Sequence, residues 1–350
     1  MNTTMTLFRS LFKKDVLHIV RDRRTVMITI LIPVMLLLLF GFAISTEVNN
    51  VRIVTVTDMH TDRTRLITEQ LRVNEYFTYL GEATHTEIDS LLRRGIADAV
   101  LCLHEDNGAL ASQIIVDASN PTVGQASAAY IRSVVSGGND APVLTQTMYN
   151  PQMKSAYNFV PGILGMIFIL ICAIMTSVSI VSEKETGTMN LLLVSPARPG
   201  MIILSKLLPY FLLSCIILAT TLLIAYTVLG LPASFTLLSV VLLSLLYIAL
   251  ALSIGLFVST LVSTQLSALI VSAVLFMLPV IMLSGMIFPV DNMPAILQGI
   301  STVIPARWYI AAMRKLMIQQ LEFSYIMEEV VILAGMTVIL LVLSIRRFNR

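Results

Sequence analysis

The chain has 350 residues, of which 56% are hydrophobic and only 13% are charged. An average soluble domain has about 25% charged residues, so this composition excludes an ordinary soluble protein and indicates a polytopic membrane protein. The net charge of +2 is too small to suggest nucleic acid as a partner. Three scattered cysteines, Cys102, Cys172 and Cys215, exclude a disulfide framework, and we expect them to be packing residues.

The N-terminal segment, residues 1–25, combines apolar and basic side chains at helical spacing. Leu7 and Leu11 can share one broad apolar face, whereas Lys13 lies largely away from it. This pattern predicts an amphipathic helix in the membrane interface, although an ordinary basic flank that only sets topology is the alternative. The first membrane span is expected over residues 26–46, which carry no charge and are long enough to cross a bilayer.

A long polar insertion, residues 47–157, holds most of the acidic residues and predicts a small α/β domain. Its β-branched runs predict strands, and its amphipathic stretches predict helices, one of them with Thr86 as a cap. The expected strands are Val51–Thr57, Tyr76–Leu80, Ala97–Leu103 and Gln113–Val116, and the expected helices are Arg63–Val73, Thr86–Arg94 and Val123–Val135. The run Asp58–Asp62 favours a solvated turn after the first strand over a metal-binding loop.

The remaining residues, 158–350, contain five further apolar runs that are long enough to span a membrane. They are Phe159–Val181, Ile202–Leu229, Phe235–Leu261, Leu266–Phe288 and Ile326–Ile345. Between the last two, the segment 289–323 is amphipathic and is expected to lie outside without crossing the membrane. Pro294–Ile304 places apolar residues at helical spacing, and the aromatic pair Trp308 and Tyr309 suits a membrane interface.

A charged segment, residues 182–201, separates the second and third expected spans. Thr188 is expected to be the N-cap of a short helix, because its hydroxyl can accept from free backbone N–H groups of the next turn. Glu183 and Glu185 lie just before that helix, where the helix dipole favours negative charge. Pro196 ends the helix. We predict that this helix lies at the membrane surface and transmits force from another protein into the membrane domain.

The basic residues near the span ends predict the orientation of the chain. Lys and Arg gather before the first span, and Arg346, Arg347 and Arg350 follow the last one. With six spans, both termini and the segment 182–201 are expected on the cytoplasmic side. The insertion 47–157 is then expected outside.

Motifs for catalysis, cofactors or metals are absent from the sequence, so we predict no catalytic residue, no bound cofactor and no metal site. It contains no Gly-x-x-x-x-Gly-Lys-Ser/Thr loop for phosphates, and no His-Glu-x-x-His, Cys-x-x-Cys or Gly-x-Ser-x-Gly motif. Its four histidines have no metal-ligand spacing. The central parts of the spans also lack ionisable residues, which ion-coupled transporters usually use as relays. Energy for transport is therefore expected from outside the bilayer.

The chain resembles the integral-membrane subunits of the ABC-2 family of ABC exporters over essentially its whole length. The resemblance depends on Glu183-Lys184-Glu185-Thr186-Gly187-Thr188, followed by Leu191-Leu192 and Ser195-Pro196. It is supported by Lys206, Pro209-Tyr210, Ile287-Phe288-Pro289, Met293-Pro294 and Pro305-Ala306-Arg307-Trp308-Tyr309. The long insertion after the first span is typical of the members that resemble drug-efflux permeases. Asn190 departs from the acidic residue that this family pattern leads us to expect.

The resemblance implies a permease subunit of an ATP-driven exporter in the bacterial inner membrane, paired with a second copy or a close paralogue. A separate ATP-binding cassette subunit would bind ATP, so this chain would be no enzyme and would hold no cofactor. The residues implied to couple to that subunit are Glu183, Lys184, Glu185, Thr186, Gly187 and Thr188. For Glu183 and Glu185, the alternative is that they only complement the helix dipole.

Spans rich in Leu, Met, Phe, Ser and Thr suit a hydrophobic or amphipathic substrate, although the same residues also serve helix packing. The external domain has three open roles, namely to gate the exit, to dock a periplasmic adaptor or to stabilise the dimer. Two other functions also stay open. An ion-coupled secondary carrier is disfavoured by the missing intramembrane charges. A non-transporting receptor or scaffold with an external ligand-binding domain needs fewer spans than this chain has.

Overall fold

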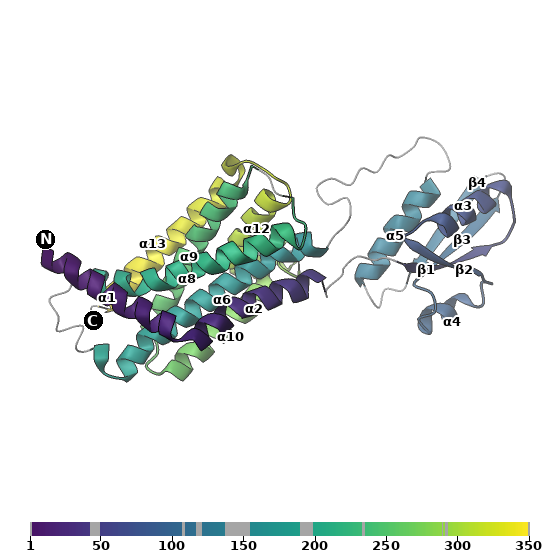
Figure 1. Ribbon diagram of the computed structural model, residues 1–350. Helices are drawn as coiled ribbons and strands as arrows, with labels where there is room; N and C mark the ends of the chain where they lie inside the picture. Colours follow the sequence, from purple (N-terminus) through teal and green to yellow (C-terminus); the bar gives the residue numbers. More distant parts are fainter. Residues whose placement is uncertain are drawn as a thin grey trace. The chain divides into compact units, whose positions relative to one another are not determined.

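The computed structural model describes residues 2–42, 50–106, 109–116, 121–136, 155–189, 199–232, 235–288, 290 and 293–348. The chain forms two compact units. One comprises Met1–Ile44 and Ser155–Arg350, and the other comprises Ser45–Lys154. The first unit is a helical bundle, and the second is a sheet covered by helices (Figure 1).

Long apolar runs form the helices of the first unit. Those long and apolar enough to cross a membrane are α2 (Arg23–Phe42), α6 (Ser155–Glu185), α8 (Pro199–Thr227), α9 (Leu237–Ser259), α10 (Gln265–Leu283) and α13 (Met327–Phe348). The others are α1 (Asn2–Arg21), α11 (Ala295–Ser301), α12 (Pro305–Met317) and a 3₁₀ turn, Phe323–Ile326. The protein is thus a multi-pass membrane protein, with six candidate spans in the described part of the chain and an α/β unit between the first two, which confirms the predicted fold class.

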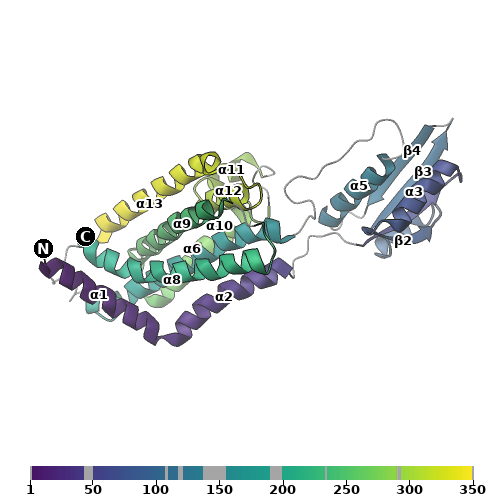
Figure 2. The ribbon, with the colours of Figure 1, turned by 45° about the horizontal axis from the view of Figure 1, so that its top comes forward.

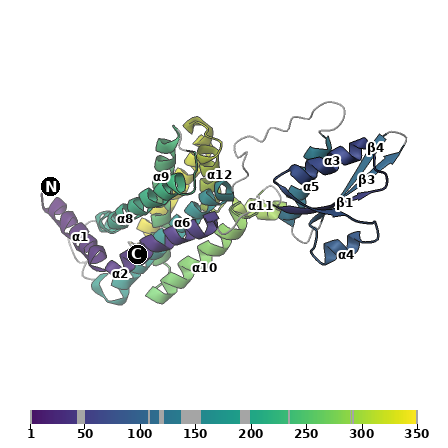
Figure 3. The same ribbon diagram turned by 45° about the vertical axis from the view of Figure 1, so that its right-hand side comes forward.

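Helices α6 and α9 lie at the centre of the bundle. In their most apolar stretches 67% and 56% of the residues are buried, against 17% in α2 and in α10, which lie at its edge (Figures 1 and 3). Gly255 permits the close approach of the two central helices. A Cβ at this position would stand 2.6 Å from the Ala173 carbonyl oxygen of α6.

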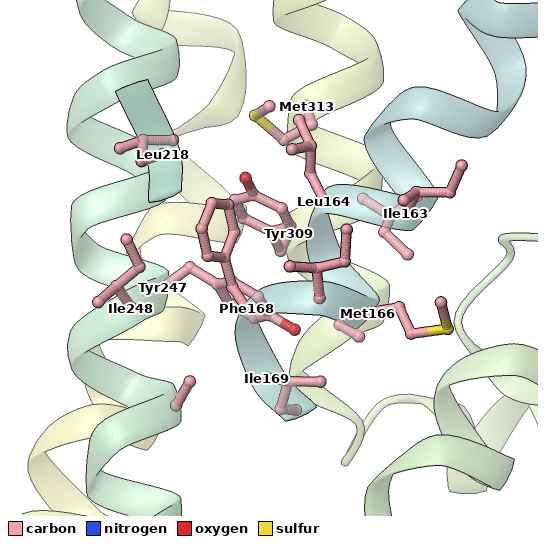
Figure 4. Close-up of a cluster of buried hydrophobic side chains, with 14 of the residues drawn as sticks. Ile163, Leu164, Met166, Phe168, Ile169, Leu218, Tyr247, Ile248, Tyr309 and Met313 are labelled. Atoms are coloured by element: carbon pink, nitrogen blue, oxygen red, sulfur yellow. The ribbon is translucent and has the colours of Figure 1, made fainter. Parts of the chain in front are cut away.

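Two stacked tyrosines join α12 to this centre. The rings of Tyr247 and Tyr309 are nearly parallel with centroids 4.1 Å apart, and Figure 4 shows them among the apolar side chains of the core. The Tyr247 hydroxyl donates to the Gly165 carbonyl oxygen at 3.0 Å, and the Tyr309 and Ser244 hydroxyls are 2.9 Å apart. Both buried hydroxyls therefore have the hydrogen-bond partners that a phenol needs in an apolar core.

The placement of α12 corrects one sequence prediction. Tyr309 is fully buried, so its expected place beside Trp308 at a membrane interface is wrong. The helical period places Tyr309 on the same face as Ala306, Met313 and other buried residues, and that face packs against α6 and α9. Trp308 is only partly buried and donates its indole N–H to the Thr302 carbonyl oxygen at 2.8 Å.

The second unit has one four-stranded sheet in the order β2-β1-β3-β4. Its strands are β1 (Val51–Thr57), β2 (Phe77–Glu82), β3 (Ala99–Asp106) and β4 (Ala109–Val116), and its helices are α3 (Asp62–Val73), α4 (Ile88–Arg93) and α5 (Pro121–Ser136). Strand β1 is parallel to β2 and to β3, and β4 is antiparallel to β3. All four predicted strands and all three predicted helices are present; β1 has the predicted bounds, and the other elements have shifted ends.

The start of α4 differs from the prediction. Glu87 is its N-cap residue and makes no side-chain cap hydrogen bond, so the predicted cap at Thr86 is wrong. The Glu87 carboxylate instead accepts from the backbone N–H and the hydroxyl of Thr84, both at 2.9 Å. The local polar network therefore stabilises the turn before the helix, and not the helix end itself.

Two histidines distant in sequence converge on Asp58, which directly follows β1. His85 Nε2 lies 3.2 Å from Asp58 Oδ1, and His104 Nδ1 lies 2.8 Å from Oδ2. The hydrogen bonds to His104 and His85 hold the pKa of the Asp58 carboxyl below its ordinary value. Within the described ranges, no group of three His, Cys, Asp or Glu side chains has an arrangement that could hold a metal ion. The three cysteines are free, and Cys102 and Cys172 are buried.

Candidate functional site

The C-terminal end of α6 carries the motif that the sequence singles out. Glu183, Lys184 and Glu185 form the last turn of α6, and Thr186 and Gly187 form a turn after it. Gly187 has φ +75°, a conformation that side-chain-bearing residues rarely adopt, and among the described residues other than its chain neighbours no atom lies within 4 Å of the place of a Cβ there. The predicted short helix begins at Thr188 and Met189, and its continuation over 190–198 lies outside the described residues.

Glu183 joins three helices through two lysines. Its Oε1 accepts from Lys206 Nζ of α8 at 2.6 Å and from Lys14 Nζ of α1 at 2.8 Å. Lys206 Nζ also lies 3.3 Å from Asp15 Oδ2. Helix α1 thus lies alongside α8, as Figure 2 shows, with charged groups closing the contact.

Lys14 and Lys206 differ in how far they are exposed to solvent. The side chains of Glu183 and Asp15 are 13% exposed and that of Lys206 is 7% exposed, whereas that of Lys14 is 54% exposed. Burial is the largest single influence on the pKa of Lys14 and lowers it. The hydrogen bond to Glu183 and the negative charge of that carboxylate together outweigh burial, so the pKa of Lys14 is raised above its ordinary value. Lys206 is therefore the shielded partner of Glu183, and Lys14 is its solvent-facing partner.

The next two residues connect α6 to two further helices. Lys184 Nζ donates to the Ser259 carbonyl oxygen at the end of α9. Glu185 Oε2 accepts from Gln265, the first residue of α10, through its backbone N–H at 3.2 Å and its side-chain amide at 3.0 Å. Three consecutive charged residues thus connect the end of α6 to α1, α8, α9 and α10.

The two threonines of the motif hold the turn. Thr186 Oγ1 donates to the Ser182 carbonyl oxygen at 2.8 Å, and Thr188 Oγ1 donates to the Glu183 carbonyl oxygen at 3.2 Å. Thr188 therefore satisfies a carbonyl at the end of α6, in addition to its predicted role as N-cap of the next helix. The N–H groups that it would cap lie outside the described residues. Glu185, Thr186, Gly187 and Thr188 are exposed.

A cavity of about 610 Å³ lies beside this motif, between α1, α2, α6, α8 and α10. Its apolar wall includes Ile19, Val26, Ile174, Met175 and Leu269, and its polar end includes Lys14, Asp15, Glu183 and Lys206. In the described part of the chain, Glu183 Oε2 is buried without a hydrogen-bond partner. The cavity therefore combines a mainly apolar wall with one ionic end.

Comparisons with known proteins define the family. A family model described as ABC-2 family transporter protein matches residues 23–346. The chain belongs to the ABC-2 transporter family. The probable multidrug ABC transporter permease YbhS of Escherichia coli K12 is 27% identical over 329 residues, which cover 88% of this chain and 87% of that protein.

Two further proteins are also similar to this ABC-2 family chain. The probable multidrug ABC transporter permease YbhR of Escherichia coli K12 is 28% identical over 320 residues, which cover 86% of each chain. ABC transporter G family member 20 of Dictyostelium discoideum is 26% identical over 188 residues, covering 53% of this chain and 26% of that protein. These findings confirm the resemblance to ABC-2 permeases, and they make the chain the membrane subunit of an ABC transporter, which implies an ATP-binding cassette partner.

The sequence singled out Lys206 in this ABC-2 chain only as part of a motif. It gave no sign that Lys206 pairs with Glu183 and Asp15. A lone lysine near the end of an apolar span is the signal that could have revealed this, because a buried ammonium needs a counter-ion. The pairing of Glu183 with Lys14 could not be predicted in the same way. Helix α1 carries several basic residues, and the sequence does not say which of them lies near Glu183.

Proposed function

We propose that this chain is the permease subunit of an ATP-driven exporter that moves a hydrophobic or amphipathic compound outward. A separate nucleotide-binding subunit hydrolyses the ATP, and a second copy or a close paralogue completes the membrane domain. In this proposal the protein lies in a bacterial inner membrane, with both termini and the turn after α6 on the cytoplasmic side. The names of the two Escherichia coli relatives support a drug-like substrate.

One observation carries the proposal: the exposed turn after α6 directly follows three residues bonded to four other helices. A push on Thr186 or Gly187 must displace the end of α6. That displacement strains the contacts of Glu183, Lys184 and Glu185 with α1, α8, α9 and α10. Packed helices respond to such shifts by moving as rigid bodies, which is how a small local motion becomes a large rearrangement.

Five of the six motif residues are assigned two roles under this proposal. Thr186, Gly187 and Thr188 are exposed and make the contact with the nucleotide-binding subunit. Glu183 is mostly buried and already paired, so it transmits the motion inward and does not meet basic groups of the partner. Glu185 is exposed but bonded to Gln265, so it takes part in both roles.

The cavity beside Glu183 supports the substrate class. An apolar wall favours a hydrophobic body, and an ionic end accommodates a polar head, which together describe an amphipathic compound. Its volume of about 610 Å³ is within the range of about 300–1,000 Å³ found for small-molecule sites.

The test is to purify the chain in mild detergent from its own cells, identify the proteins that accompany it, and reconstitute the complex in vesicles. We expect a protein with a phosphate-binding loop to accompany it, and ATP-dependent outward transport that persists when ionophores collapse ion gradients. Transport that needs an ion gradient and proceeds without ATP would establish the carrier instead. A preparation with neither ATP hydrolysis nor transport would favour the receptor.

A further inference from the structure

In the α/β unit the neighbouring parallel strands β1 and β2 are followed by helices that lie on opposite faces of the sheet. The chain leaves β1 into α3, whose Ile67 and Leu71 pack with Val51 and Ile53 on one face of the sheet. It leaves β2 into α4, which packs on the opposite face, and Figure 3 shows α3 and α4 on opposite sides. In α/β proteins ligands bind outside the carboxyl ends of the parallel strands, near the strand at which the strand order reverses, which here is β1.

A cavity of about 510 Å³ lies beside the carboxyl ends of β1 and β2. Its walls come from the ends of β1 and β2 and from one side of α3. Thr57, the last residue of β1, lines it, and Thr57 Oγ1 is buried without a hydrogen-bond partner in the described residues. Buried hydroxyls are nearly always hydrogen-bonded, so an unpartnered one at a cavity indicates a missing partner.

Both signs of charge line the same cavity. Arg65, Glu69 and Arg72 recur at helical spacing along one side of α3, and Glu82 ends β2 on the adjoining wall. Their mutual contacts are long: Arg72 Nη1 lies 3.9 Å from Glu69 Oε1, and Glu82 Oε2 lies 3.8 Å from His60 Nε2. A charge-assisted hydrogen bond spans about 2.7–2.9 Å. These groups therefore keep their capacity to bind an incoming ligand.

The residues at the start of α3 argue against a simple anion as the ligand of this cavity. A simple anion would be expected at the N-terminus of a helix. Here Thr61 and Thr64 form a capping box, and the carboxylate of Asp62 occupies the first turn. An anion at that end would meet like charge, so the guanidinium groups farther along α3 are the available partners for a carboxylate. The carboxylates of Glu69 and Glu82, which line the same cavity, are available to bind a positive group of the same ligand.

We propose that this cavity binds a small zwitterion that carries an ammonium and a carboxylate, as free amino acids and short peptides do. Its carboxylate contacts Arg65 and Arg72, its ammonium contacts Glu69 and Glu82, and a polar atom of the ligand partners Thr57 Oγ1. The site is separate from the motif at the end of α6, and it does not depend on the proposed transport function.

The test is isothermal titration calorimetry on the purified full-length chain with the common amino acids and the dipeptide Gly-Ser. L-serine is compared with ethanolamine, which lacks the carboxylate, and with lactate, which lacks the ammonium. We expect saturable binding of at least one zwitterion, and binding weaker by about tenfold or more for its single-charge analogues. Binding by the dipeptide and by no free amino acid would identify a peptide terminus as the ligand.

Variants locate the site. Arg65→Gln and Glu82→Gln should each weaken binding by about tenfold, because each removes a charge-assisted contact. Arg94→Gln and Glu75→Gln are the matched controls, since both residues are exposed and neither lines the cavity. The proposal is wrong if no zwitterion binds saturably, if lactate or ethanolamine binds as tightly as L-serine, or if the control variants weaken binding equally.

Discussion

Lys206 Nζ lies 2.6 Å from Glu183 Oε1, so the start of α8 is bonded directly to the end of α6 in a nearly solvent-free contact. Glu183 belongs to the motif that characterises the family resemblance, and Lys206 follows it by 23 residues. A buried ion pair is weak evidence for stability, because desolvation opposes the attraction between the charges. Removing only one partner is costly, however, so the pair strongly favours a fixed arrangement of the two helices.

Lys206→Met should destabilise the membrane unit much more than Lys14→Met. Loss of a buried partner costs about 3–5 kcal/mol, whereas loss of an exposed partner costs about 0–1 kcal/mol. The two variants remove the same charge from the same carboxylate, which makes Lys14→Met the matched control. Thermal unfolding of the purified chain in detergent measures the difference. Equal losses of stability would contradict the shielding of Lys206.

Gly255→Ala and Gly335→Ala should have opposite effects on stability. A Cβ at 255 would stand 2.6 Å from a backbone oxygen of α6, so the central helices must separate, at a cost of about 1–3 kcal/mol. Apart from the backbone of its own helix and its chain neighbours, no described residue lies within 4 Å of a Cβ at 335, so alanine there gains about 0.5–1 kcal/mol of helix propensity. Thermal unfolding of both variants checks this, and a harmless Gly255→Ala would refute close packing of α6 and α9.

Tyr309→Phe should destabilise the bundle by about 1–2 kcal/mol with little change in packing. The variant keeps the ring that stacks on Tyr247 but leaves the buried Ser244 hydroxyl without this partner. Ser244→Ala in addition should recover part of the loss, since the unsatisfied hydroxyl is then removed as well. The free energies of unfolding of the two single variants and the double variant form a double-mutant cycle. If the losses of the two single variants simply add in the double variant, the hydrogen bond does not contribute.

Asp98→Asn should destabilise the α/β unit at neutral pH and have no effect in acid. Arg52 donates to the Asp98 carboxylate through Nε at 3.0 Å, Nη2 at 2.7 Å and its backbone N–H at 3.0 Å. The side-chain hydrogen bond from Arg52 is the largest cause of the lowered pKa of Asp98. A lowered pKa stabilises the fold above the ordinary value of 3.8, and this contribution disappears as pH falls through the folded-state pKa.

The expected loss for Asp98→Asn at neutral pH is about 1 kcal/mol, because the pair is partly exposed. Hydrogen exchange of β1 and β3 amides in the full chain, followed between about pH 7 and about pH 2.5, measures it. Glu75→Gln is the control for removal of a surface carboxylate. A difference between Asp98→Asn and the parent chain that stays unchanged as pH falls from about 7 to about 2.5 would contradict the assignment to this ion pair.

The sequence predicted the spans and the α/β unit well, because each depends on local signals. A long uncharged run such as 26–46 has few alternatives to a membrane helix. The burial of Tyr309 was not predictable, because the period of α12 identifies an apolar stripe but not whether lipid or other helices cover it. The pairing of Glu183 with Lys206 was likewise hidden, since it depends on how α6 and α8 pack and not on either segment alone.

In the α/β unit, the contacts of His85 and His104 with Asp58 were likewise not predictable from local sequence patterns. The three residues are widely separated in the sequence, and only the order of the parallel strands brings them together. The cavity at the end of β1 and β2 depends on the same strand order. Local sequence patterns predicted the strands there, but they did not predict which strands are neighbours.

The central claim, that the turn after α6 couples a nucleotide-binding partner to the helices, is tested by Gly187→Leu with Gly230→Leu as control. Both glycines have positive φ, +75° and +67°, and open space around a Cβ, so both variants carry similar backbone strain. The measurement is substrate transported per ATP hydrolysed by the reconstituted complex. We predict that Gly187→Leu lowers this ratio at unchanged expression whereas Gly230→Leu preserves it; a normal ratio in Gly187→Leu would contradict the account.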